Sequence, residues 1–537
     1  AVTCTNTQDD IAPMLTLVKT VTNDDGGTIN DPDAFGLRID GELVLDSAPN
    51  PVQVGSHTVS EDGLPGYMAS AWGGDCAADG SITLALAQDA TCTITNDDQA
   101  PGLTLIKQVI NDNAGSAVPA DWTLTATGPA GFSGTGPSVS NGVVFTPGTY
   151  DLSESGPAGY AASDWACEGG IQDDADTITL ALGESATCTI TNDDIEPTLA
   201  LANTVTNDNG GTAVLADWVL SATGPSGFVG TGPSVSNGVN FQSGTYDLSA
   251  SGPAGYQGAA WICTGGSQDD ADTITVGVGE TVSCTLALDD IEPSLTLIKE
   301  VVTDNGGTAL PSAWTLTATG TAGFSGVGPS VSNAANFQSG TYDLSESGPA
   351  GYLASDWTCV GGQQVDGDTV TVDIGDNVAC TIINDDIVPT LTLILTDVTN
   401  DNGGDALYGD WTLTATGPTG FSGPGPSTTS GPGFDAGAYT LFLVGPGGYN
   451  KSSWSCIGGA QDGNTVTLGL GATATCSISI DDITPTLTVF KSITNNSGGG
   501  VTDPNAFGLQ IDGVPVLHNT TTEVDAGNHT VSEVGLF

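Results

Sequence analysis

The chain has 537 residues, and 63 acidic side chains against 6 basic ones give it a formal net charge of −57. This charge argues against nucleic-acid binding, because phosphate contacts need lysine and arginine. It also argues against docking on anionic lipid. No run of about 18 apolar residues occurs, so we expect no membrane insertion from this segment. Eleven cysteines in so acidic a chain are typical of an extracellular or cell-surface protein.

Internal repeats organise the sequence. Cysteines recur every 96 residues from Cys92 to Cys476, and pairs of aspartates keep the same period. Each repeat contains short stretches rich in Thr, Val and Leu that alternate apolar and polar residues between Gly and Asn turns, without helical periodicity. The pattern predicts an all-β chain, a tandem array of immunoglobulin-like β-sandwich domains of about 96 residues, each with about seven short strands.

Repeat boundaries follow from prolines that open each unit. We assign the end of a preceding repeat to residues 1–12, five repeats to 13–100, 101–196, 197–292, 293–388 and 389–484, and a truncated sixth to 485–537. The linkers are short and contain proline, which predicts an elongated rod. Lys19 and Lys491 are equivalent residues of matching units displaced by 491 − 19 = 472 residues, which suggests a five-domain super-repeat. We expect a piece of a longer chain or filament whose partners are further copies of its own repeats.

Several repeats direct polar side chains toward their own core. Alternate residues of a strand share a face, so Lys107 lies with Leu105, Glu154 with Leu152, and Asn192 with the core face of the last strand. Repeats 3 and 5 replace all three polar residues together, by Asn203, Ala250 and Leu288 and by Leu395, Leu443 and Ile480. The lysine, glutamate and asparagine are thus present together or replaced together. This predicts that they form one buried cluster, because an unpartnered buried charge is costly.

The segment GTYDLSESGPAGY at residues 148–160 resembles the E-box of Cna B-type (SpaA-like, prealbumin-like) domains of bacterial surface adhesins and pilins. The resemblance implies prealbumin-like sandwiches in which an early-strand lysine and a last-strand asparagine form a spontaneous isopeptide bond, assisted by the E-box glutamate. It covers all the repeats, and it departs from the family in the cysteines and in repeats 3 and 5. The implied sets are Lys19, Asn96 and Glu61; Lys107, Asn192 and Glu154; Lys299, Asn384 and Glu346; and Lys491 with Glu533.

Two chemistries fit these sets. In the first, burial favours a neutral lysine amine beside a protonated acid, and the amine attacks the asparagine side chain. In the second, lysine and glutamate form a buried ion pair hydrogen-bonded to asparagine, and no covalent bond forms. The ion pair would explain equally well why repeats 3 and 5 lack all three residues, because removing one partner leaves the other as an unpaired buried charge.

Ten cysteines pair by position within the repeats, and Cys4 is left over. A zinc site is disfavoured because no repeat supplies four Cys or His ligands. The predicted disulfides are Cys76–Cys92, Cys167–Cys188, Cys263–Cys284, Cys359–Cys380 and Cys456–Cys476.

Acidic clusters are expected where the first and last strands of each repeat end side by side. Oxygen-rich clusters suit Ca²⁺, which would stiffen the domain joints, whereas Asx turns followed by solvated carboxylates would explain them without an ion. The candidate ligands are Asp24, Asp25, Asp97 and Asp98; Asp112, Asp193 and Asp194; Asp208, Asp289 and Asp290; Asp304, Asp385 and Asp386; and Asp401, Asp481 and Asp482.

The sequence favours a structural protein, the stalk or fibre of a microbial cell-surface adhesin or extracellular filament. Alternatives are a self-polymerising filament or surface-layer subunit and a repeat module that binds glycan, ice or a host protein. We expect no enzyme beyond single-turnover isopeptide formation, and no required cofactor. The histidines lack a nearby nucleophile pattern, and one tryptophan per repeat is expected in the core: Trp122, Trp218, Trp314 and Trp411.

Overall fold

The computed structural model describes residues 2–536. Its regular structure consists of strands β1 to β54 and six short 3₁₀ helices, and residues 2–536 contain no α-helix. The all-β prediction is therefore confirmed. Within the described range, no helix has the length and apolar character needed to cross a membrane.

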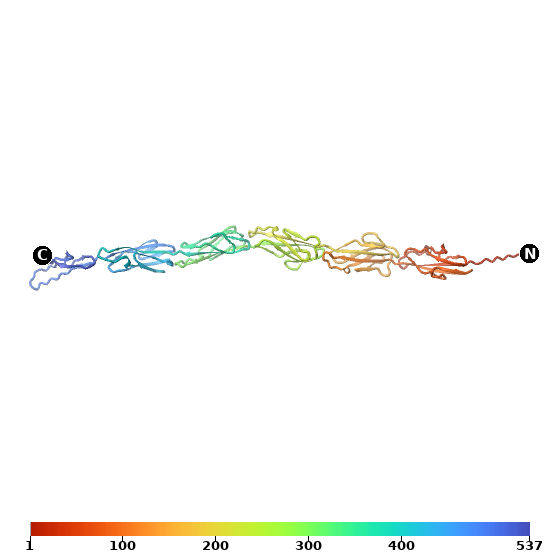
Figure 1. Cartoon of the computed structure of the whole chain (residues 1–537), viewed down its shortest axis with the longest axis horizontal. Helices are drawn as coiled ribbons and strands as arrows, with labels where there is room; N and C mark the ends of the chain where they lie inside the picture. The colour runs from red at the N-terminus through yellow and green to blue at the C-terminus, as the bar shows by residue number, and fades with distance from the viewer. Residues whose placement is uncertain (1, 537) are drawn as a thin grey trace. The chain divides into compact units, whose positions relative to one another are not determined.

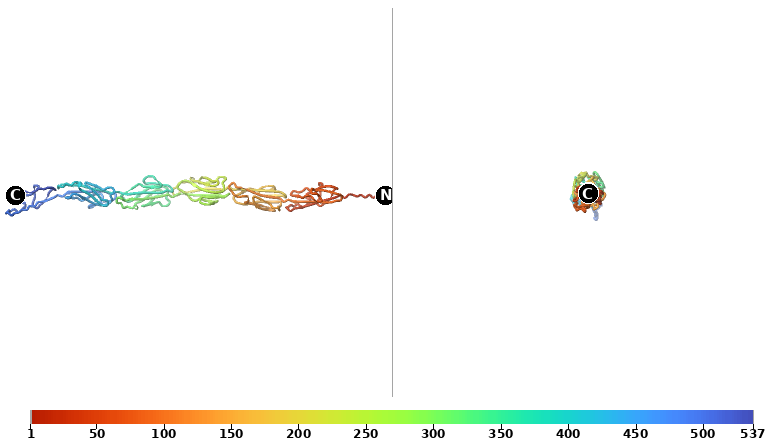
Figure 2. Two further views of the ribbon diagram at one scale, coloured as in Figure 1. Left: turned by 60° about the horizontal axis from the view of Figure 1, so that its bottom comes forward. Right: turned by 90° about the vertical axis from the view of Figure 1, so that its right-hand side faces the viewer.

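Each repeat folds as its own bundle of strands that run along the length of the repeat (Figure 1), as the turned views of Figure 2 also show. The chain divides into two compact units, and the division runs through repeat 3, because Asn207–Thr212 and Gly255–Gln257 group with the residues from Asp289 onward.

Repeat 2 illustrates the fold. Its elements are β10 (Gly102–Ile110), η2 (Pro119–Asp121), β11 (Thr123–Thr127), β12 (Phe132–Thr135), β13 (Ser138–Ser140), β14 (Gly148–Ser155), β15 (Tyr160–Ala162), β16 (Ala166–Glu168), β17 (Ile171–Gln172), β18 (Thr177–Leu180) and β19 (Ser185–Asp194). One sheet has the order β13-β10-β19-β15, with β16 also paired to β19, and the other has the order β12-β11-β14-β18-β17.

Repeats 3, 4 and 5 follow the same order. Repeat 3 has β20 (Thr198–Thr206), η3 (Leu215–Asp217), β21 (Val219–Thr223), β22 (Phe228–Thr231), β23 (Ser234–Ser236), β24 (Gly244–Ser251), β25 (Tyr256–Gly258), β26 (Ile262–Thr264), β27 (Ser267–Gln268), β28 (Thr273–Val276) and β29 (Thr281–Asp290). Repeat 4 has β30 (Ser294–Val302), η4 (Pro311–Ala313), β31 (Thr315–Thr319), β32 (Phe324–Val327), β33 (Ser330–Ser332), β34 (Gly340–Ser347), β35 (Tyr352–Ala354), β36 (Thr358–Val360), β37 (Gln363–Gln364), β38 (Thr369–Val372) and β39 (Asn377–Asp386). Repeat 5 has β40 (Thr390–Thr399), η5 (Tyr408–Asp410), β41 (Thr412–Thr416), β42 (Phe421–Pro424), β43 (Ser427–Thr429), β44 (Gly437–Val444), β45 (Tyr449–Lys451), β46 (Ser455–Ile457), β47 (Ala460–Asp462), β48 (Thr465–Leu468) and β49 (Thr473–Asp482).

Repeats 1 and 6 are a second type, in which a longer 3₁₀ helix precedes a short hairpin. Repeat 1 has β1 (Met14–Thr22), η1 (Pro32–Phe35), β2 (Arg38–Ile39), β3 (Glu42–Leu43), β4 (Pro49–Pro51), β5 (Gly55–Ser60), β6 (Tyr67–Ala69), β7 (Gly73–Gly74), β8 (Ser81–Leu84) and β9 (Asp89–Asp98). Repeat 6 has β50 (Thr486–Thr488), η6 (Pro504–Phe507), β51 (Leu509–Ile511), β52 (Val514–Pro515), β53 (Thr521–Glu523) and β54 (Val531–Glu533).

The first and last long strands of each complete repeat are neighbours. In repeat 2, β10 and β19 run parallel and pair from Gly102 with Ser185 to Ile110 with Asp193. Their inward side chains alternate along both strands, as a sandwich core requires. The sequence predicted this parallel contact, but it missed the short edge strands such as β13 and β17, so the repeat has ten strands rather than about seven. Short edge strands limit unwanted pairing with other chains.

The core of repeat 2 is apolar and aromatic. Trp122 is 1 % exposed and Tyr150 is fully buried. The tryptophan ring meets the Tyr160 ring edge-on at 5.2 Å. The equivalent tryptophans of repeats 3, 4 and 5 are equally buried, so the expected core position of the tryptophan series is confirmed.

Candidate functional site: a buried lysine, glutamate and asparagine

Lys107 lies at the centre of β10, on the face that points into the sandwich. Its side chain is fully buried, and its Nζ is 2.9 Å from Oε2 of Glu154 on β14 in the opposite sheet. The two atoms form an ion pair without the angles of a hydrogen bond. The Nζ also lies 4.8 Å from the centre of the Trp122 ring, where a cation is attracted to the aromatic face.

Asn192 lies on the neighbouring strand β19, two residues beyond Ile190, the partner of Lys107 in the parallel register. Its side chain is 3 % exposed, and among the described residues its Oδ1 accepts no hydrogen bond. Two residues along a strand and one strand across correspond to a diagonal of about 8 Å between Cα atoms. An extended lysine side chain can cover such a diagonal, so the fold places the amine and the amide in the same buried region.

Burial shapes the acid–base chemistry of this region. Desolvation lowers the pKa of Lys107, while its interaction with the nearby Glu154 carboxylate opposes that decrease. The same causes lower the pKa of Lys19 and of Lys299. A lower lysine pKa increases the fraction of neutral amine, which is the nucleophilic form.

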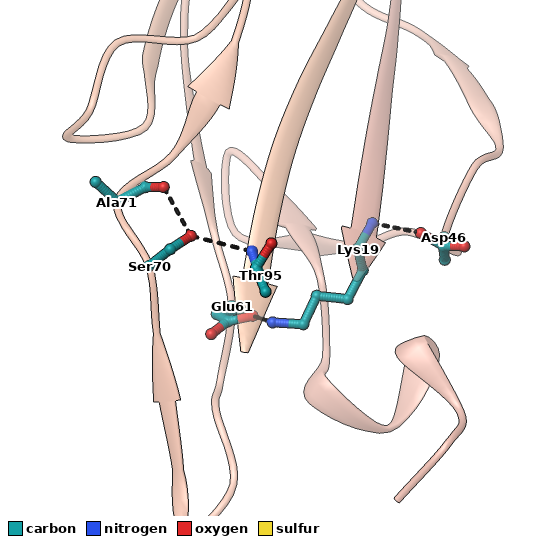
Figure 3. A network of polar contacts seen from close by, with 6 residues as sticks. All are labelled: Lys19, Asp46, Glu61, Ser70, Ala71 and Thr95. Carbon is teal, nitrogen blue, oxygen red and sulfur yellow. Dashed lines mark hydrogen bonds and ion pairs between the residues drawn. The ribbon is translucent and has the colours of Figure 1, made fainter. Parts of the chain in front are cut away.

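Repeat 1 has the same arrangement, and Figure 3 shows its contact between Lys19 and Glu61. The side chain of Lys19 extends past Thr95 and donates a hydrogen bond to Glu61, and its Nζ lies 4.5 Å from the centre of the Phe35 ring. Asn96 is 1 % exposed, and neither its Oδ1 nor its Nδ2 has a hydrogen-bond partner among residues 2–536.

Repeat 4 repeats the geometry, and repeat 6 holds part of it. In repeat 4 the Nζ of Lys299 lies 3.0 Å from Oε2 of Glu346, and Asn384 is 3 % exposed. In repeat 6 the Nζ of Lys491 lies 2.5 Å from Oε2 of Glu533, and the two side chains are 23 % and 46 % exposed.

Repeats 3 and 5 lack the reactive set and fill its place differently. In repeat 3, the Nδ2 of Asn203 donates to the carbonyl of Leu215 at 3.1 Å. In repeat 5, Leu395, Leu443 and Ile480 are buried at the three positions. Neither repeat holds an amine, an acid and an amide together at these positions.

The predicted disulfides are confirmed. Each joins the last long strand of a repeat to a neighbouring segment, which in repeats 2–5 is the short strand beside it. Cys4 is exposed and free. The bonds are Cys76–Cys92, Cys167–Cys188, Cys263–Cys284, Cys359–Cys380 and Cys456–Cys476.

The structure brings the acidic candidates together and shows what the innermost aspartate does. Asp194 is 3 % exposed, and its carboxylate accepts hydrogen bonds from the backbone N–H groups of Asp112, Asn113 and Gly115. It therefore holds the turn after β10 against the end of β19. Asp98, Asp290, Asp386 and Asp482 hold the equivalent turns.

Three carboxylates lie close together at each of these turns. In repeat 2 they belong to Asp112, Asp193 and Asp194, and desolvation, followed by the charges of Asp193 and Asp194, raises the pKa of Asp112. Because N–H donors already occupy the inner carboxylate, only the two outer carboxylates are left as free anionic ligands, and backbone carbonyls or water would have to complete the six to eight oxygen ligands that Ca²⁺ takes. The residues present fit a hydrogen-bonded turn better than a calcium site.

One polar pair escaped the sequence analysis. His57 is 7 % exposed, and its Nδ1 lies 2.6 Å from a carboxylate oxygen of Asp40. The sequence held a signal for this pair: His57 and Asp40 recur as His529 and Asp512, at the same displacement as Lys19 and Lys491. These two residues also form the same contact in repeat 6.

Known proteins with similar structures include "The Bacillus anthracis TIE protein", with 13% identity, a TM-score of 0.37 and coverage of 80% of this chain and 70% of that one. The major pilin protein of Streptococcus pyogenes has 11% identity and a TM-score of 0.19, with 36% of this chain and 98% of that one covered. Two B repeat units of the collagen binding protein of Staphylococcus aureus have 8% identity and a TM-score of 0.15, with 71% and 99% covered. No curated protein matches the chain.

The family of prealbumin-like fold domains matches the chain five times, over residues 10–94, 98–190, 194–286, 290–382 and 386–478. These ranges follow the repeats described above and cover most of the chain. Each range contains the first long strand of its repeat and most of the last one. The chain belongs to the family of prealbumin-like fold domains.

Proposed function

We propose that this chain is a load-bearing segment of a stalk or fibre at a microbial cell surface, with repeats 1, 2 and 4 closed by isopeptide bonds. The observation that carries the proposal is the buried Lys107–Glu154 pair beside the orphaned Oδ1 of Asn192. The pilin and the collagen-binding protein among the similar structures agree with a surface role. The tryptophan series is buried in the cores of repeats 2 to 5, so these rings do not form an exposed aromatic platform for a glycan.

The proposed reaction uses only groups of the repeat. Glu154 takes a proton from Lys107, and the neutral Nζ attacks the side-chain carbonyl carbon of Asn192. Glu154 then gives this proton to the departing amide nitrogen and takes a second proton from the attacking lysine nitrogen, so that Glu154 ends protonated. One C–N bond forms between lysine and asparagine, the original C–NH₂ bond breaks, and one molecule of ammonia leaves.

Such a bond would change how the repeat carries force. Lys107 lies near the start of repeat 2 and Asn192 near its end, on adjacent parallel strands. A covalent bond between them would pass tension from the beginning of the repeat to its end and bypass residues 108–191. Repeats 3 and 5 would retain only their disulfides as covalent restraints.

Intact mass spectrometry of the reduced full chain tests the proposal. We expect the loss of three ammonia molecules, one from each of repeats 1, 2 and 4, and cross-linked peptides that join Lys107 to Asn192. Repeat 3, with Asn203, Ala250 and Leu288 at the three positions, is the internal control and should give only linear peptides. An unmodified mass would leave buried ion pairs alone and reject the cross-link.

A further inference from the structure

His57 lies where both of its ring nitrogens face acceptors. Nδ1 is 2.6 Å from Oδ2 of Asp40, and Nε2 is 2.6 Å from the backbone carbonyl of Gln53. A carbonyl oxygen only accepts hydrogen bonds, and so does an ionised carboxylate. A neutral imidazole has one N–H and could satisfy one of these contacts, whereas the imidazolium ion has two and satisfies both.

The contacts of His57 connect separate parts of repeat 1. Asp40 forms the turn between β2 and β3, and its Oδ1 also accepts from the backbone N–H of Thr58 at 2.9 Å. Gln53 lies in the loop between β4 and β5. The ring, on β5, therefore joins the edge hairpin of its own sheet, whose order is β3-β2-β5-β8, to the loop that enters β5.

Few charged groups surround the ring. Among the described residues, Asp40 is the carboxylate in contact with it, and Glu42 on β3 lines the adjoining hollow of about 320 Å³. The other elements around the hollow present Val44, Pro51 and Val52, and Ile82 on β8 pairs with His57. The hollow gives solvent a route to the buried ring.

We propose that His57 is a permanent structural cation in neutral solution, and that its deprotonation in alkaline solution releases the β2–β3 hairpin of repeat 1. His529 repeats the arrangement in repeat 6, with its Nδ1 2.6 Å from Oδ2 of Asp512 and its Nε2 2.5 Å from the carbonyl of Asp525. Repeats 2 to 5 contain no histidine. This histidine-dependent response to alkali would therefore be confined to the second type of repeat.

The direction of the pH effect follows from the charges. The hydrogen bond to Asp40 raises the pKa of His57, and the same bond lowers the pKa of Asp40. The stabilisation from the histidine is fully present below the unfolded-state pKa of about 6.5 and is lost as the pH rises through the raised folded-state pKa. Protonation of Asp40 in acid removes its contribution. The full set of contacts around His57 is therefore present between the folded-state pKa of Asp40 and that of His57.

Nuclear magnetic resonance of the full chain with ¹⁵N- and ¹³C-labelled histidine tests this proposal, and His57→Gln assigns the signal. We expect both ring nitrogens of His57 to be protonated at pH 6, with a titration midpoint above that of the same chain unfolded in urea. Hydrogen exchange at the Thr58 amide, corrected for its intrinsic pH dependence, should accelerate across the same midpoint. A neutral ring at pH 6, or a midpoint at or below the unfolded value, would overturn the proposal.

Two variants separate charge from packing. Asp40→Asn keeps an acceptor near Nδ1 but removes the negative charge, so we expect the His57 midpoint to move to lower pH. Asp62→Asn is the matched control, because Asp62 pairs with Arg38 on the same hairpin and is not a partner of the ring. An equal decrease of the His57 titration midpoint in both variants would contradict the proposal that Asp40 keeps the ring charged.

Discussion

Lys107 and Asn192 lie on adjacent parallel strands two residues out of register, Lys107 opposite Ile190 and Asn192 opposite Val109. Parallel strands keep this offset fixed, because each inward position on one strand faces an inward position on the other. The offset places a lysine amine and an asparagine amide in one buried region with Glu154 from the opposite sheet. The same relationship recurs in repeats 1 and 4.

The role of the glutamate can be tested by one substitution. We expect Glu154→Ala to prevent cross-linking of repeat 2, so that the reduced chain is heavier by one ammonia than expected for the substitution alone. The physical reason is that the lysine then lacks a group to accept its proton and return it to the leaving nitrogen. Glu168→Ala, on the exposed strand β16, should retain the ammonia loss. Full cross-linking in Glu154→Ala would contradict the proposed proton transfer.

When the chain is pulled from its ends, we expect few unfolding steps, because only some of its repeats can unfold. We expect repeats 3 and 5 to unfold under force, each stopped short by its disulfide loop, while repeats 1, 2 and 4 stay closed. Single-molecule force spectroscopy measures the number and length of these steps. Lys107→Ala should add one further step from repeat 2. Unfolding of repeat 2 in the unsubstituted chain would show that no covalent bond bypasses its strands.

The buried aspartate at the end of β19 should be a large contributor to stability. Asp194→Ala removes a carboxylate that accepts from three backbone N–H groups, and hydrogen bonds to charged groups are worth about 1.5–3 kcal/mol each. Because the loosened turn can partly rehydrate, we expect a loss of roughly 3 kcal/mol in the free energy of unfolding of repeat 2. Denaturant unfolding followed by hydrogen exchange at Gly115 measures it. Asp193→Ala, at the exposed neighbouring position, should cost far less, and equal losses would refute the proposed role of Asp194.

Calcium should have little effect on the folded chain. The inner carboxylate of each acidic cluster already accepts backbone hydrogen bonds, and the remaining carboxylates are too few for a full Ca²⁺ shell. We expect the same melting temperature in millimolar calcium and in a chelator, after matching the ionic strength with sodium to account for screening. A rise with calcium that Asp112→Asn abolishes would restore the calcium hypothesis for repeat 2.

The alternation of inward and outward residues along each strand made most of the buried polar residues predictable. Cys188 and Asn192 are buried and alternate with half-buried or exposed residues on β19, and the same rule placed Lys107 inward on β10. The rule also places Asp194 inward, but a sequence pattern does not show that an aspartate at a strand end accepts N–H groups from a distant turn. For the same reason, the sequence analysis placed it among possible metal ligands.

By itself, the sequence determined the repeat period, the all-β class, the disulfide pairs and the membership of the lysine, glutamate and asparagine sets. Those features depend on spacing and on alternation, which are local properties of the chain. Only the tertiary structure decided that Asp194 supports a turn and that both ring nitrogens of His57 face acceptors. Each of those findings depends on which atoms meet across segments far apart in the chain, and that is settled by how the two sheets and their connecting loops pack.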